Sequence, residues 1–467
     1  MATTNSQLTY LSLAEVANRI ATRELSPLEV TNTMLDRLAV VEPQLHSYYT
    51  IFAADALIAA KEAETQIRNG HYKGPLHGIP IAIKDIYEAG PTTGGSKLRK
   101  DYVARQDCTS VKKLKQAGGI ILGKLATYEF AAGLPTLASY FQPARNPWNL
   151  DIDPGGSSSG SGAAVAAGLA YGAMGSDTGG SIRWPAFCCG IVGMKATYGR
   201  VSRAGVFPLS WNLDHTGPMT RTVEDCALML QACAGYDPLD PASADEPVPN
   251  FSGKLGRDIK GMRVGIPRKL FMENCDKEIL ASFEAAVTQM TTLGAEVRDV
   301  DSITFGEMSA LLWPIIAADA AAYHLEDMKT RPGDYNPDLR MILAIGTLVS
   351  ATGYLQAQRV RDQVRRKMLQ QLETVDLFMM PTTGFMPGPI RSEAPVGSFI
   401  TSDSFSIYTP LMNLTGFPTL ALPCGFSAAG LPIGFQLAGK PFDETTVFQA
   451  GHAYEQSTPW HQRHPAL

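Results

Sequence analysis

The sequence predicts an α/β fold, because patterns typical of helices alternate along the chain with short apolar runs typical of buried strands. A helical pattern over residues 52–68 ends before the breaker 74–76 and is followed by the apolar run 79–83. The same order of helix, Gly-Gly stop and strand recurs within 109–124. Strand, helix and strand patterns then follow one another across 262–300. These observations favour a sheet whose strands are joined by helices.

Two helix-start signals lie near the N-terminus. Ser12 is followed by Glu15, and Ser26 by Glu29, which is the S-x-x-E spacing of a capping box. In a capping box the serine hydroxyl and the glutamate carboxylate satisfy backbone N–H groups that have no partner inside the helix. We therefore expect a helical hairpin over residues 10–42.

Further elements are expected in the second half of the chain. The pattern predicts one long helix from Asp338 to Thr374, a buried strand over 377–380 and a Pro/Gly-rich loop over 381–395. Residues 237–253 are rich in Pro, Asp and Ser, so they suit either a linker or a long surface loop. We place no domain boundary there.

Charge and composition exclude several classes of protein. Over 467 residues, 40 Lys and Arg stand against 45 Asp and Glu, which gives a formal net charge of -5. This balance offers no basic surface for nucleic acid or for an anionic membrane. The chain has no run of about 18 apolar residues and no signal-peptide pattern. We expect a cytoplasmic protein that spans no membrane.

The metal and disulfide classes are also disfavoured. The seven cysteines are scattered and include no Cys-x-x-Cys pair, which fits a reducing compartment and indicates neither a disulfide framework nor a zinc site. His452, His461 and His464 have no carboxylates near them at metal-site spacing. We expect no metal ion and no organic cofactor.

The most unusual segment covers residues 154–200, where glycines flank serines at two places. PGGSSSGSG starts this segment, and Gly179-Gly180-Ser181 lies further along. A flexible linker is the plain alternative for the first loop. However, the small, apolar and uncharged stretch 163–173 follows it and predicts a buried helix. Two such loops around one buried helix indicate backbone amides brought close to a ligand.

Lys84 follows the strand predicted at 79–83. A lysine at the end of a strand most often extends to the surface. If the side chain is buried instead, desolvation lowers its pKa by several units, and the neutral amine accepts a proton from a hydroxyl at neutral pH. The serine loops offer such hydroxyls.

Together these segments resemble the amidase signature family. The strand GIPIAIKD with Lys84, the PGGSSSGS loop and the segment GSDTGGSIRWPAFCCGIVGMKATYGRVSR are similar to the family's motifs, and the interval between Ser157 and Ser181 matches. NPWN at 146–149, GPMTRTVEDCALML at 217–230, and NLTGFPTLALPCGF through GLPIGFQLAGKPFDE are also similar. The likeness covers nearly the whole chain.

The resemblance implies a Ser-cisSer-Lys triad in which Ser181 is the nucleophile, Ser157 the bridging serine and Lys84 the base. Neutral Lys84 would take a proton that Ser157 relays from Ser181, which activates a weak nucleophile without histidine. The Gly156–Ser157 peptide bond would be cis. Ser157 would return the proton to the departing nitrogen, and water would hydrolyse the acyl-enzyme through the same relay.

Other positions are carried over from the same motifs. Ala131 falls where family members place a residue beside the bridging serine and the substrate. Ser158, Asp177 and Arg183 are expected to support the serine loops. The oxyanion of the tetrahedral intermediate is expected to meet backbone N–H groups of the second serine loop, namely those of Thr178, Gly179, Gly180 and Ser181.

The resemblance also implies the architecture. It implies one domain over 1–467, with a mixed, twisted central sheet covered by helices on both faces. The signature core spans about 74–230 and a variable pocket region about 305–405. It also places the early helices outside the sheet, where a homodimer contact is an alternative that stays open. Three segments of the pocket region are apolar and predict an apolar or aromatic amide substrate: 313–323, 342–354 and 379–389.

The leading hypothesis is a stand-alone serine amidase acting on a small molecule, with ester and carbamate cleavage open to the same chemistry. The nearest alternative is the A subunit of the glutamine-dependent tRNA amidotransferases. It resembles the chain over 175–203, but it carries an Asp for glutamine where Ser406 stands here. The first serine loop also departs from the family's common GGSSGGSA at Ser159 and Gly162, where one small residue replaces another.

Other classes of protein fit less well. Residues 156–160 satisfy the G-x-S-x-G pattern of an α/β-hydrolase esterase with Ser158 as nucleophile, but 146–155 are not a buried strand pattern. A binding protein without catalysis is disfavoured, because neither a phosphate loop nor a dinucleotide fingerprint is present. Cys188 and Cys189 lie in an apolar setting and are expected to be structural.

Overall fold

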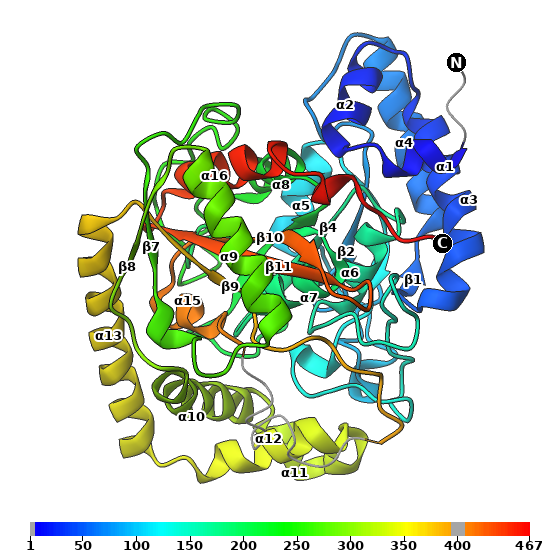
Figure 1. The fold of residues 1–467 in the computed structure, drawn as a ribbon. Helices are drawn as coiled ribbons and strands as arrows, with labels where there is room; N and C mark the ends of the chain where they lie inside the picture. The colour runs from blue at the N-terminus through cyan, green and yellow to red at the C-terminus, as the bar shows by residue number, and fades with distance from the viewer. Residues whose placement is uncertain (1–4, 394–406) are drawn as a thin grey trace.

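The computed structural model describes residues 5–393 and 407–467 (Figure 1). Within them, eleven strands form a single sheet. From one edge to the other the strands are β1 (Tyr48–Ile51), β3 (Ile120–Leu125), β2 (Pro80–Lys84), β4 (Gly172–Asp177), β6 (His215–Thr220), β5 (Val192–Lys195), β10 (Thr419–Phe426), β11 (Pro432–Gly439), β9 (Leu377–Pro381), β7 (Arg263–Ile266) and β8 (Glu296–Asp299).

The sheet is mixed, as the resemblance implied. Strand β2 is parallel to β3 and β4, and β7 is parallel to β8 and β9. The remaining pairs are antiparallel. The strands predicted at 79–83, 262–266, 295–300 and 377–380 are confirmed within two residues at each end.

Helices cover both faces of the sheet (Figure 1). α6 (Ser159–Ala166) and α7 (Arg183–Cys189) pack on one face, and α8 (Val223–Cys233) and α16 (Glu444–Gln456) pack on the other. Two glycines of β4 lie on opposite faces of the sheet. Gly175 faces Ser158, while Gly172 faces Met229 of α8. α9 (Lys277–Thr292), predicted at 277–293, crosses the sheet near α16. The predicted fold class is confirmed.

The N-terminal helices lie outside the sheet, beyond the edge at β1 (Figure 1). They are α1 (Asn5–Tyr10), α2 (Leu13–Ala21), α3 (Pro27–Leu45) and α4 (Ala53–Arg68). Helices begin at both predicted starts, as α2 and α3, but α3 packs against α1 and α4 and α2 packs against α8, so the two helices are not packed on each other as a hairpin. Ser12 forms the capping box with Glu15, and the Ser26 hydroxyl accepts from the backbone N–H of Glu29. Pairing of two chains through these helices stays a prediction.

Two predicted helices have different bounds in the structure. The expected helix from Asp338 to Thr374 is two helices, α12 (Pro337–Leu348) and α13 (Ala351–Thr374), bent by 98°. The break has a local cause, because the Ser350 hydroxyl accepts from the Gly353 N–H and starts a new helix. The buried helix expected over 163–173 is α6, which ends earlier because the chain turns at Gly168 with φ +69° and enters β4.

The remaining elements complete the two ends of the molecule. α5 (Thr109–Gln116) precedes β3 as predicted. α10 (Phe305–Tyr323) and α11 (Leu325–Thr330) lie beside α12 along the lower side in Figure 1. α15 (Pro410–Thr415) precedes β10. Short 3-10 turns are η1 (Lys97–Arg99), η2 (Glu129–Ala131), η3 (Arg268–Leu270), η4 (Pro332–Asp334) and η5 (Trp460–Gln462).

Residues 237–253 form a surface loop that is attached to the core. Asp240 makes an ion pair with Arg203, and Asp237 accepts a hydrogen bond from the Ser202 hydroxyl. In the described part of the chain no single helix is long and apolar enough to cross a bilayer. Taken together, the bent pair α12 and α13 meets that length and composition test.

The topology brings the predicted site residues to one edge of the sheet. β2 and β4 are parallel, so their carboxyl ends, at Lys84 and Asp177, lie side by side. α6 precedes β4 in the chain and returns along the sheet, so its N-terminus with Ser157 comes to the same edge. Ligand sites commonly form at the carboxyl ends of parallel strands.

Candidate active site

Lys84 is completely buried and its amine meets two serine hydroxyls. Its Nζ donates to Ser157 Oγ at 2.7 Å and to Ser176 Oγ at 2.9 Å. Burial lowers the pKa of Lys84 to about 7, while the negative charges of Asp177 and Asp214 oppose this shift. A large fraction of Lys84 is therefore neutral at physiological pH and can accept a proton through Ser157.

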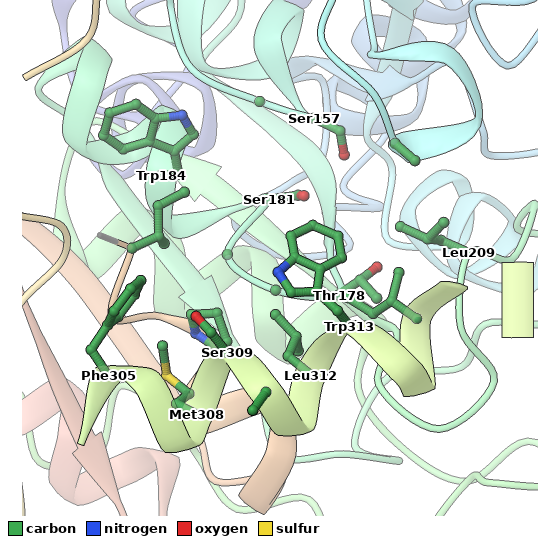
Figure 2. A pocket seen from close by; sticks show the side chains of 18 of the residues that line it. Ser157, Thr178, Ser181, Trp184, Leu209, Phe305, Met308, Ser309, Leu312 and Trp313 are labelled. Atoms are coloured by element: carbon green, nitrogen blue, oxygen red, sulfur yellow. The ribbon is translucent and has the colours of Figure 1, made fainter. Parts of the chain in front are cut away.

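The two serine loops meet beside this lysine. The Gly156–Ser157 peptide bond is cis, as the resemblance implied. The Ser158 N–H donates to the carbonyl oxygen of Ser181 at 3.2 Å, which joins the two loops through their backbones. In Figure 2 the Ser181 hydroxyl lies at the cavity wall and is directed toward Ser157. Ser157 and Ser181 both line the same cavity.

Asp177 and Arg183 form a buried ion pair behind the second loop. The Asp177 carboxylate accepts from Nε and Nη2 of Arg183, both at 3.0 Å, and each side chain is 0% exposed. Burial opposes ionisation of Asp177, but the Arg183 guanidinium outweighs it and holds the pKa of Asp177 well below its usual range. Arg183 also donates to Gln436 and Asn413. The ion pair is tied to the second loop, because Asp177 also accepts from the N–H groups of Gly180 and Ile182.

The expected oxyanion donors are only partly available. The Gly180 N–H donates to Asp177 Oδ1 at 2.7 Å, so this one of the four expected donors faces the buried carboxylate. The N–H groups of Gly179 and Ser181 have no hydrogen-bond partner among the described residues. Gly180 has φ +133°, and a side chain there would overlap Thr409, so only glycine fits.

Thr178 and Ser158 connect these loops to the surrounding core. The Thr178 hydroxyl donates to Asp214 at 2.6 Å. Asp214 also accepts from two backbone N–H groups of residues 209–210, and burial raises its pKa to about 6. The Ser158 hydroxyl donates to the Ser176 carbonyl at 3.2 Å and accepts from the Ser176 N–H. Ser158 therefore supports the Lys84 site, and it is not directed into the cavity.

A cavity of about 810 Å³ opens in front of Ser157 and Ser181. The serine loops and Ala131 form one wall, and Ala131 has a left-handed backbone with φ +64°. The facing wall is one side of α10, as Figure 2 shows. Its apolar lining residues recur at helical spacing: Phe305, Met308, Leu312, Trp313 and Ile316. The cavity thus joins a polar wall to an apolar one, which is typical of small-molecule sites.

The substrate region differs in part from the expected segments. Segment 313–323 contributes Trp313 and Ile316, and 342–354 contributes Ile342. None of 379–389 is among the described lining residues. Met379 and Met380 are instead inside the sheet, because they belong to β9. Lys269, Leu270, Glu273 and Asn274 line the cavity without having been predicted. The first half of α10 also lines it, and it lies in the expected pocket region of about 305–405 but outside the three apolar segments. Ser406 lies outside the described residues.

Sequence reasoning missed several polar residues of the site. Ser176, Asp214, Asn413 and Gln436 contact Lys84, Thr178 or Arg183. Ser176 lies in the GSDTGGS motif, so its place in that motif was a usable signal. The other three have no local pattern, because they come from distant segments of the chain.

The structure disfavours the alternative catalytic sites. Cys188 and Cys189 are buried in α7, and burial raises the pKa of both thiols well above its ordinary value. Residues 146–155 form no strand, so the strand-turn-helix elbow of an α/β-hydrolase is missing before Ser158. No group of three or more His, Cys, Asp or Glu residues that could hold a metal occurs within the described ranges.

Comparisons with known proteins give a consistent result. The family profile described as Amidase matches residues 29–448. An amidase of Pseudomonas putida is 44% identical over 99% of this chain and 99% of its own. The A subunit of the glutamyl-tRNA(Gln) amidotransferase of Geobacter metallireducens is 40% identical over 97% of this chain and 99% of its own. A bacterial aryl acylamidase structure of the amidase signature enzymes has a TM-score of 0.87 at 28% identity, covering 97% of each chain.

Proposed function

The chain belongs to the amidase signature family of hydrolases that act on C–N bonds, and we propose that it cleaves a carboxamide through an acyl-enzyme on Ser181. One observation carries this proposal: the buried amine of Lys84 donates to Ser157 Oγ at 2.7 Å and has a pKa of about 7. A lysine in this setting can serve as a base toward the serine pair at neutral pH.

The reaction begins with proton transfer away from Ser181. Neutral Lys84 takes the Ser157 proton, Ser157 takes the Ser181 proton, and Ser181 Oγ attacks the amide carbon. The oxyanion that forms accepts from the N–H groups of Gly179 and Ser181, which are the donors left open in the second loop. Thr178 adds a third N–H on the same loop.

Breakdown of this intermediate uses the same residues in reverse. Ser157 gives a proton to the leaving nitrogen, and Lys84 restores the proton of Ser157. The C–N bond breaks, the amine departs and the acyl group stays on Ser181. Water then attacks the acyl carbon while it gives a proton to Ser157, which passes its own proton to Lys84. The bond between the acyl carbon and Ser181 Oγ breaks, Ser181 takes back a proton through Ser157, and the acid product leaves. Esters and carbamates would pass through the same acyl-enzyme.

The cavity supports an apolar or aromatic substrate group. Leu312 and Trp313 face the serines across the cavity in Figure 2, and Ile316 lines the same cavity, so an aryl or branched alkyl group would bury apolar surface there. The likeness to a solved aryl acylamidase supports the same substrate class.

A second candidate is the glutaminase of a tRNA amidotransferase, because one chain of such an enzyme is 40% identical over nearly the whole length. This function predicts that the protein releases ammonia from glutamine and depends on partner chains. The apolar wall of α10 favours the stand-alone amidase. Glutamine turnover measured beside aryl amides discriminates the two functions.

The test compares hydrolysis of aryl amides, anilides, esters and carbamates by the wild type, Ser181→Ala, Ser157→Ala and Lys84→Ala. Lys112→Ala and Ser252→Ala, which change a lysine and a serine outside the cavity, are the matched controls. A serine-directed phosphonate and mass spectrometry locate the adduct. We expect the adduct on Ser181 and loss of activity in the three site variants only. An adduct on Ser158, or undiminished turnover by Ser181→Ala, would refute the proposal.

A further inference from the structure

Tyr128 contacts the segment that carries Ser157 at three points. Its backbone N–H donates to the carbonyl oxygen of Ser157 at 3.1 Å. Its ring occupies the space where a side chain on Gly156 would lie. Its hydroxyl donates to the Asp153 carboxylate, 3.0 Å from each oxygen. The backbone, the ring and the hydroxyl of Tyr128 therefore all contact residues 153–157.

Asp153 connects the tyrosine hydroxyl to the same segment. Its Oδ1 accepts from the Gly155 N–H at 2.6 Å in addition to the Tyr128 hydroxyl. Residues 153–157 belong to no helix or strand, and two of them are glycine. A segment of this kind has many accessible backbone conformations, so contacts from outside must fix its position.

Tyr128 is itself held firmly. It follows β3 by three residues, and the next residues make the turn at Phe130 and Ala131, both with positive φ. Phe130 is 1% exposed and packs edge-on against His324 at 4.6 Å between ring centroids. Glu129 accepts from the backbone N–H of Asn336 at 2.6 Å. Tyr128 can thus act as a fixed support for the irregular segment 153–157.

We propose that Tyr128 and Asp153 form one clamp that positions Ser157, keeping its hydroxyl within hydrogen-bond distance of Lys84 and directed at Ser181. This inference rests on the proposed role of Ser157 as the bridging serine. Neither Tyr128 nor Asp153 gives or takes a proton in the proposed reaction, so both are positioning residues. Proton relays lose efficiency steeply with misalignment, so loosening the clamp slows acylation even when the fold is intact.

The charge state of Asp153 gives the clamp a pH dependence. Burial raises the pKa of Asp153 to about 6, while the Tyr128 hydroxyl and the Gly155 N–H oppose the shift. Among the described residues, the thiols of Cys188 and Cys189 are influenced by the charge of Asp153, and burial raises the pKa of both, so they stay neutral. Below about pH 6 the carboxyl gains a proton and one of its oxygens becomes a donor, which weakens the clamp.

The experiment uses Tyr128→Phe, Asp153→Asn and the double variant. Tyr128→Phe keeps the ring and the backbone N–H and removes only the bond to Asp153. The readout is the rate constant for phosphonate labelling of Ser181, together with kcat/KM for an aryl amide. Tyr49→Phe is the matched control, because its hydroxyl donates to the neighbouring Thr127 carbonyl at 2.9 Å and does not reach 153–157.

We expect each single variant to slow labelling about tenfold, which corresponds to about 1.4 kcal/mol. The double variant should be no slower than Asp153→Asn, because Tyr128→Phe removes only a contact that Asp153→Asn already weakens. Rates within twofold of the wild type, or losses that multiply in the double variant, would overturn the clamp. Thermal unfolding shows whether each variant is folded.

A pH series separates positioning from a merely structural role. In the wild type, Lys84 gains a proton below about pH 7 and Asp153 below about pH 6. Because loss of the clamp slows the reaction about tenfold, kcat/KM of the wild type should fall about fivefold more between about pH 8 and about pH 5 than that of Asp153→Asn, in which only Lys84 titrates. An equal fall in the two proteins would contradict the clamp. If the wild-type adduct forms on another residue, the proposed function fails first and this inference fails with it.

Discussion

The rate of acylation should rise through neutral pH, because Lys84 must be neutral to accept a proton. With a pKa of about 7, roughly one-tenth of Lys84 is neutral at pH 6 and roughly nine-tenths at pH 8. We therefore expect kcat/KM for an aryl amide to increase about tenfold between these values. Loss of the lysine proton raises activity, so Lys84 accounts for this tenfold rise, and ionisation of Asp153 adds about twofold to it if the clamp is correct.

A change of nearby charge tests this assignment. Asp214 lies near Lys84, and its negative charge favours the ammonium form. Asp214→Asn removes that charge, so the pKa of Lys84 falls and the acid limb of kcat/KM moves to lower pH. Initial rates measured from about pH 5 to about pH 9 provide the comparison. A rate that is independent of pH, or an acid limb that stays in place in Asp214→Asn, would refute the reasoning.

Three further predictions follow from buried contacts. Arg183→Ala leaves the Asp177 carboxylate buried without its cation, and urea denaturation should show a loss of about 3–5 kcal/mol. Leu312→Ala removes part of the apolar wall and should lower kcat/KM for aryl amides about fivefold, with little effect on acetamide-sized substrates. Burial raises the pKa of Glu455 from 4.5 to about 8, so the folded chain binds its proton more tightly and loses stability as pH rises across that range. Unfolding free energies of Glu455→Gln should decline less over the same range, and an identical decline would contradict this account.

Much of the local structure could be predicted from the sequence. Helix starts such as Ser12 with Glu15 depend on contacts within one turn, so their pattern is visible in a short stretch of chain. The prediction of one helix from Asp338 to Thr374 was wrong, because Ser350 caps a new helix where the apolar pattern continues. The pocket segment 379–389 was misplaced, because apolar residues fill a strand inside the sheet as readily as they line a cavity.

Motifs of consecutive residues predict the residue types of the proposed chemistry, namely a lysine after an apolar strand and two serines framed by glycine. How these residues meet depends on the tertiary structure. Burial of Lys84 brings its pKa to about 7, and Asp177 takes up the Gly180 N–H that had been expected to face the oxyanion. The Tyr128 and Asp153 contact likewise joins segments that no motif connects. Desolvation and hydrogen bonding depend on every neighbour in space, and those neighbours are distant in the sequence.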